Sequence, residues 1–143
     1  MPGAVPVFSA VDISIRFSGM RSPGQISEMV SNIVTSIARE CHENGSSLIG
    51  HVKCLAESTD GRRMVCSVVS HEEEAECRGE VGQTLLVELS LVSTVYDLDQ
   101  AIFDRIVDKA VRTASRAVDP KAEMIERGHG DLCAHIDDHG HSH

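Results

Sequence analysis

The chain has 143 residues and a formal net charge of −9, with 13 Lys and Arg against 22 Asp and Glu. This length suffices for one domain with one core, and the acidic balance argues against a protein that binds nucleic acid or an acidic membrane surface. Hydrophobic residues make up 41% of the chain but aromatic residues only 3%, and Trp is absent. We therefore expect a core of Val, Ile, Leu and Ala side chains.

The cellular location is predicted from two features of the sequence. The first seventeen residues lack a basic stretch followed by an apolar run, so we expect neither a signal peptide nor a transmembrane segment. The five cysteines are scattered without a Cys-x-x-Cys pair, and in such a chain they are usually reduced thiols. Together these features predict a cytoplasmic protein.

The first two elements are a strand and a helix. Apolar residues alternate with polar ones over residues 7–17, which predicts a strand. Ser22 and Gln25 then have the spacing of a capping box, with proline between them at the first turn. A stripe of apolar residues at helical spacing follows, and Asn44-Gly45 is a helix stop. The pattern predicts a helix over residues 23–43.

Two strands are predicted next, over residues 48–58 and 63–70, joined by the turn Thr59-Asp60-Gly61. A three-residue loop with Gly61 in the left-handed conformation places Cys54 opposite Cys66. We expect these two cysteines to be buried, adjacent and reduced. The even-numbered positions of both strands are predicted to face the core: Leu48, Val52, Cys54, Ala56, Met64, Cys66 and Val68.

An acidic connector over residues 71–82 leads to the longest regular stretch of the chain. Residues 84–96 alternate as a strand, and residues 98–118 carry one apolar stripe at helical spacing. Asp119-Pro120 ends that helix, since a residue before proline is disfavoured in the α region. A short helical turn is predicted between Pro120 and Arg127.

The predicted order is strand, helix, strand, strand, strand, helix. It indicates an α+β domain over residues 1–127, a two-layer sandwich in which two helices cover one face of a four-stranded, mostly antiparallel sheet. A ferredoxin-like order would need one more strand after the second helix, and none is evident. Residues 23–118 share the element order of a double-stranded RNA-binding domain, but acidic residues stand where its last helix needs basic ones: Asp97, Asp99 and Asp104.

The C-terminal segment, residues 128–143, carries the strongest chemical signal. Imidazole and thiolate groups bind nickel, zinc and copper, and nearby carboxylates attract cations. The composition of this segment resembles that of the His-rich segments of zinc transporters and nickel chaperones, and the resemblance covers this segment alone. We expect it to be disordered without metal, since it has little to bury. The candidate metal ligands are His129, Cys133, His135, His139, His141 and His143.

A second, looser metal site is conceivable at His71 and Cys77 in the acidic connector, the alternative being a solvated loop. His51 and Cys54 are three residues apart on a strand, so they point to opposite faces and cannot share one ion.

The face of the sheet away from the helices is the remaining candidate site. A carboxylate beside a histidine can perform acid–base catalysis. Its expected apolar area is large, which favours a homodimer through this face. The expected polar residues are Asp12, Arg16, His51, Lys53, Glu57 and Glu88, and the expected apolar residues are Phe8, Ile49, Leu55, Val65, Val69, Leu86 and Val92.

The sequence favours a small cytoplasmic metal-binding protein, a chaperone or buffer for nickel or zinc, that captures the ion with its C-terminal segment and hands it to a metalloenzyme maturation partner. Two alternatives remain. One is a small oligomeric enzyme that uses the polar residues of the open sheet face. The other is an oligomeric interaction or regulatory module in which the His-rich segment is incidental.

Overall fold

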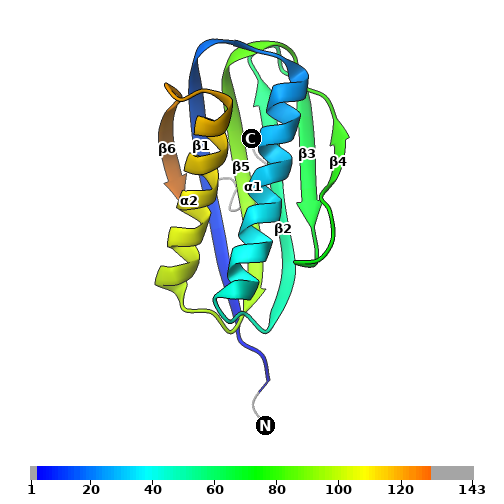
Figure 1. Ribbon diagram of the computed structural model, residues 1–143, viewed down its shortest axis with the longest axis vertical. Helices are drawn as coiled ribbons and strands as arrows, with labels where there is room; N and C mark the ends of the chain where they lie inside the picture. Colours follow the sequence, from blue (N-terminus) through cyan, green and yellow to red (C-terminus); the bar gives the residue numbers. More distant parts are fainter. Residues whose placement is uncertain (1–2, 130–143) are drawn as a thin grey trace, which may run out of the picture.

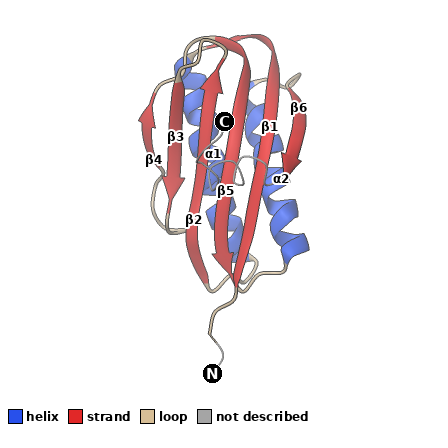
Figure 2. Ribbon diagram, turned by 180° about the vertical axis from the view of Figure 1, so that it is seen from behind, coloured by secondary structure: helices blue, strands red, loops and turns tan. Residues whose placement is uncertain are grey.

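The computed structural model describes residues 3–129. Its elements are β1 (Pro6–Arg21), α1 (Pro23–Glu43), β2 (Leu48–Ser58), β3 (Arg63–Val68), β4 (Glu76–Gly79), β5 (Thr84–Tyr96), α2 (Gln100–Val118) and β6 (Glu123–His129). The strands form one antiparallel sheet in the order β4-β3-β2-β5-β1-β6. Both helices cover the same face (Figure 1), and the other face is seen from behind in Figure 2. The predicted two-layer α+β class is confirmed, but the sheet has six strands instead of four.

The connections define two interlocked β-α-β units. β1 and β2 both pair antiparallel with β5, so they run parallel to each other with β5 between them, and α1 links them. In the same way, β5 and β6 flank β1 and are linked by α2. The strands β6-β1-β5-β2 therefore have the ferredoxin-like split β-α-β order, and β3 and β4 extend the sheet beyond β2.

This topology corrects the expectation that no strand follows the second helix. The chain after Pro120 forms the edge strand β6, where a helical turn was predicted. Met124 of β6 pairs with Ile15 of β1 and packs against the core, while Ile125 points to the opposite face and is 45% exposed. A strand at the edge with one partner needs little apolar sequence, so its alternation is weak.

The helix ends follow from capping chemistry. The Ser22 hydroxyl accepts a hydrogen bond from the Gln25 backbone nitrogen at 3.2 Å, and the Gln25 side chain accepts one from the Ser22 nitrogen at 2.9 Å. This capping box starts α1 at the predicted residue. The Asp99 carboxylate accepts hydrogen bonds from the nitrogens of Ala101 and Ile102, so α2 begins at Gln100, two residues after the predicted start.

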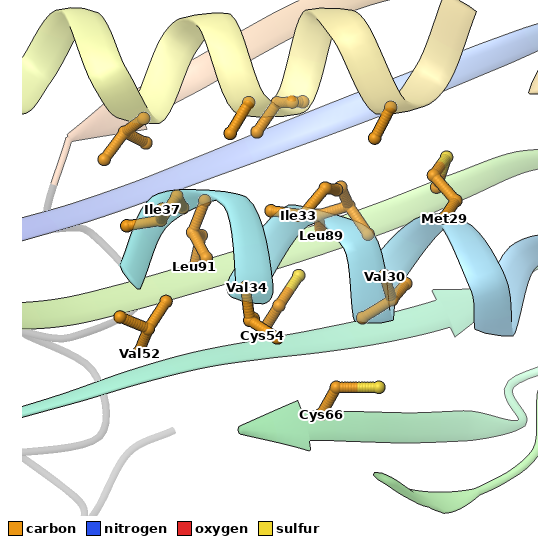
Figure 3. Packing of buried hydrophobic residues seen from close by; sticks show 14 of the residues in the cluster. Met29, Val30, Ile33, Val34, Ile37, Val52, Cys54, Cys66, Leu89 and Leu91 are labelled. Atoms are coloured by element: carbon orange, nitrogen blue, oxygen red, sulfur yellow. The ribbon is translucent and has the colours of Figure 1, made fainter. Parts of the chain in front are cut away.

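The core lies between the helices and the sheet and is aliphatic, as the composition predicts. Figure 3 shows Ile33 and Ile37 of α1 together with Leu89 and Leu91 of β5, all nearly or fully buried. Phe103 is the largest fully buried side chain. The packed layer fixes which face of each strand is turned away from the helices, and that open face carries the candidate chemistry of the domain.

The β2–β3 hairpin has the predicted register. Cys54 pairs with Cys66, and Gly61 in the loop has a φ of 87°. A bulge at Gly50 shifts the pairing of β2 with β5, however, and reverses the alternation before it. Ile49 is therefore buried and Leu48 is 57% exposed, the opposite of their predicted faces. A side chain at Gly50 would lie 2.9 Å from the Thr94 carbonyl oxygen, so glycine is required there.

Candidate metal ligands and the open sheet face

The predicted metal-binding segment is joined to the domain through β6. His129 is the last residue of this strand, and its backbone pairs with Val11 of β1. The described chain therefore ends in the edge strand of the sheet. The other predicted ligands lie outside the described residues: Cys133, His135, His139, His141 and His143.

The cysteines of the domain differ from their predicted state. Cys54 and Cys66 are buried and adjacent, as expected. The expectation that Cys66 is a reduced thiol is wrong, because it forms a disulfide with Cys77. These two residues are paired directly in the β3–β4 ladder, with their Cα atoms 4.1 Å apart. The sequence predicts an unpaired connector around Cys77, so β4, the strand that brings Cys77 to Cys66, was not predicted.

The two free thiols of the described chain are poorly suited to metal capture. Burial raises the pKa of Cys54 to about 12. Burial, with a smaller contribution from the charge of Glu40, raises the pKa of Cys41 to about 12 as well. A metal ligand must be a thiolate, so both groups are inert at neutral pH.

The second metal site considered for His71 and Cys77, as the alternative to a solvated loop, does not form, since the Cys77 sulfur is bonded to Cys66. His71 instead stacks on His42, with ring centroids 3.5 Å apart and planes 5° from parallel. The two rings border a hollow of about 200 Å³. His42 lies in the last turn of α1 and His71 follows β3, so only the tertiary fold reveals the pair. Within residues 3–129, no three His, Cys, Asp or Glu side chains are placed to hold one metal ion.

The open face does not assemble the expected acid–base pair. His51 pairs with Thr94 of β5, whereas Asp12 pairs with Ser90, four residues further along the same strand. No carboxylate in the described chain forms a hydrogen bond or ion pair with His51. The arrangement provides no support for catalysis by this histidine.

The open face does bring two carboxylates together. Glu57 of β2 pairs directly with Glu88 of β5, a like-charge pair that is destabilising when left alone. Glu57 lies 3.6 Å from Arg63 of β3, and Glu88 lies 3.9 Å from Arg127 of β6. Both glutamates line a hollow of about 270 Å³, whose wall also includes Ser58, Thr59 and Leu86.

A diagonal of apolar side chains crosses the same face, and we refer to it as the apolar band. Leu55 pairs with Val65 across β2 and β3, and Val92 pairs with Ala10 across β5 and β1. Phe8 continues the band along β1 and is 63% exposed, while the others are partly exposed. The band is made up of Val65, Leu55, Val92, Ala10 and Phe8.

Neither described helix combines the length and the apolar character that crossing a membrane requires. A search of protein-family models, of curated proteins and of solved structures finds no match to this chain.

Proposed function

We propose that this protein captures a divalent transition metal ion, nickel or zinc, with the C-terminal segment 128–143. The observation that carries the proposal is the concentration of imidazole and thiol groups there: His129, Cys133, His135, His139, His141 and His143. Imidazole and thiolate are the ligands that these ions prefer, and the segment contains neither Lys nor Arg to repel them.

The cysteines of the folded domain support the proposal that the metal site lies in the C-terminal segment. The domain's exposed cysteine, Cys77, is held in a disulfide, and its free thiols Cys41 and Cys54 are buried with raised pKa values. The ligands with the chemistry to bind a metal at neutral pH are thus concentrated in the segment. The folded domain supplies an anchor, because β6 is paired with β1 up to His129.

The role we propose is that of a metal chaperone or buffer that hands the ion to a metalloenzyme maturation partner. Ligands that follow one another in a short stretch of sequence lose conformational entropy when they close around one ion, so we expect weaker binding than in a preformed Cys₄ site. Such binding suits an ion that must be released. The Cys66–Cys77 bond is the observation that speaks against a strongly reducing compartment.

Calorimetric titration with nickel and with zinc at neutral pH tests the proposal, on protein purified without a nickel column. In the full-length chain, His135, His139, His141 and His143 are replaced together by Asn. We expect binding to weaken at least about tenfold, equivalent to about 1.4 kcal/mol. The melting temperature should not change, because the packing described for residues 3–129 contains none of these side chains.

The matched control replaces the domain histidines His42, His51 and His71 by Asn, and it should bind metal as the unmodified protein does. If the control loses binding while the segment variant retains it, the site lies in the domain and the proposal fails. Any truncation should begin after His129, because Gly128 and His129 pair with Asp12 and Val11 within β6.

Binding should also weaken as pH falls, since each imidazole must lose its proton to bind the ion. The change is expected around the ordinary histidine pKa of about 6.5. Titrations at several pH values between about 5 and 8 measure it. Affinity that is constant over this range would exclude histidine as the main ligand.

A further inference from the structure

We propose that a second copy of this chain docks on the open sheet face, with Lys53 of each copy seated between Glu57 and Glu88 of the other. This goes beyond the proposed metal capture and does not depend on it. An isologous dimer of this kind uses the same surface twice, so every contact is made in duplicate.

Leu55 and Val65, the part of the apolar band on β2 and β3, provide the centre of such an interface. Leu55, Val65 and Val92 are partly exposed and Phe8 is 63% exposed, although all four lie on a regular sheet. The band is flanked by charged residues, Lys53 on one side and Glu57 with Glu88 on the other. An apolar centre with a charged rim is the usual anatomy of a protein interface.

The Glu57–Glu88 pair forms the site that receives Lys53 of the other copy. The two arginines that contact it belong to β3 and β6, which lie on the outer sides of the two glutamates. Both glutamates line a hollow of about 270 Å³, and none of the described residues in its wall is a lysine or an arginine. A cation entering this hollow would relieve the repulsion between two directly opposed negative charges.

Lys53 provides the cation. It is exposed and forms no ion pair with any residue of the described chain. On the open face of β2, Leu55 lies midway between Lys53 and Glu57, because alternate residues of a strand share a face. Consider a two-fold axis that runs across the strands, between the two facing sheets, and passes over Leu55. Rotation about this axis places Lys53 of each copy over the glutamate pair of the other copy.

The packing that results is physically ordinary. An axis across the strands gives two aligned sheets, which is a common arrangement in sandwiches. Facing sheets lie about 10 Å apart, a gap that a lysine from one side and a glutamate from the other can bridge. The two Leu55 side chains meet at the axis, and charge complementarity fixes the register.

Two charge-reversed variants test the proposal in full-length protein with EDTA present, which separates it from metal binding. One is Lys53→Glu, and the other is the double variant Glu57→Lys with Glu88→Lys. When either variant pairs with itself, residue 53 of each copy meets residues 57 and 88 of the other with charges of the same sign, so both contacts become repulsive. In an equimolar mixture, both become attractive again, because each variant supplies what the other needs.

Sedimentation velocity and light scattering at tens of micromolar provide the readout. The unmodified protein should have twice the 15.5 kDa mass of one chain. The dissociation constant of the dimer should be at least about tenfold higher for each variant alone than for the unmodified protein, and the mixture should recover the dimer. Leu55→Asp should abolish the dimer, whereas Leu85→Asp, at an exposed position outside the apolar band, should leave it intact.

Circular dichroism confirms that each variant is folded before its mass is measured. Three results would overturn the proposal: a monomeric unmodified protein, a Lys53→Glu dimer that is as stable as that of the unmodified protein, or a mixture of folded variants that is no more dimeric than each variant alone. The mixing experiment does not depend on a loss of signal, so misfolding cannot imitate its positive result.

Discussion

Asp119 at the end of α2 accepts hydrogen bonds from both the backbone nitrogen and the hydroxyl of Ser18 in β1, at 2.6 and 2.8 Å. The other carboxylate oxygen, Oδ1, accepts a hydrogen bond from the Lys121 nitrogen at 2.9 Å. The Arg21 guanidinium lies 3.5 Å from Oδ2, the oxygen that Ser18 contacts. The backbone hydrogen bonds from Ser18 and Lys121, with the Ser18 hydroxyl and the Arg21 charge, hold the pKa of Asp119 below its usual value. This carboxylate ties the end of the second helix to the first strand.

Replacing Asp119 by Asn should destabilise the protein at neutral pH and much less in acid. The folded-state pKa is lowered, so the carboxylate stabilises the fold above its unfolded pKa of about 3.9. That stability disappears as pH falls through the folded-state pKa. Urea unfolding at pH 7 and near pH 3 measures the difference, with the exposed Asp108→Asn as the control. An equal loss at both pH values would contradict this account.

The two faces of α2 should respond differently to truncation. Ile106 is 5% exposed, so Ile106→Ala should lower the free energy of unfolding by about 2–5 kcal/mol. Asp108 lies 3.3 Å from Arg112 on the exposed side, and Asp108→Ala should cost less than about 1 kcal/mol. Chemical denaturation compares the two. If the changes were equally mild, the assignment of the buried face would be wrong.

Reduction of the disulfide should destabilise the sheet edge. The bond joins residues eleven apart in sequence, and closing a loop of this size is worth about 3 kcal/mol in the unfolded-chain entropy model. All four residues of β4 are exposed, so little else holds this strand. Unfolding with and without dithiothreitol measures the loss. The variant Cys77→Ser should not respond to the reductant, and an equal response there would assign the effect elsewhere.

The free thiols should react slowly in the native state. Cys41 and Cys54 are buried and their pKa values are raised to about 12, so few thiolates are available to an alkylating reagent. Peptide mapping after timed alkylation should show Cys133 modified first, which stays a prediction because that residue lies outside the described chain. Cys77 should not react unless the disulfide is reduced. Rapid labelling of Cys54 would contradict its burial.

Local patterns predicted the elements that carry strong, self-contained signals. The start of α1 could be predicted because the hydrogen bonds of its capping box lie within four consecutive residues. The Cys54–Cys66 register followed from the length of one turn. By contrast, the bulge at Gly50 depends on β5, a strand more than thirty residues away, and so Leu48 and Ile49 were assigned to the wrong faces.

The missed elements are those that the rest of the fold imposes. β4 has four exposed residues, and β6 is a short edge strand, so neither has a recognisable alternation of its own. The candidate functional residues likewise include some that the sequence predicts and some that only the fold reveals. Composition alone identifies the histidines of the C-terminal segment, whereas the His42–His71 stack, the Cys66–Cys77 bond and the Glu57–Glu88 hollow arise only when distant strands come together.

The interlocked strand order also determines when this chain can fold. β1 lies between β5 and β6, so this first strand has no strand to pair with until residues 84–96 have been synthesised, whereas β2, β3 and β4 can pair with one another before that. Pairings between such distant segments are slow to form, because the loop entropy is lost before the contacts are gained. A nascent chain emerging from the ribosome would therefore keep β1 unpaired through most of its synthesis. We expect folding to be largely post-translational, in milliseconds or longer once β5 has emerged.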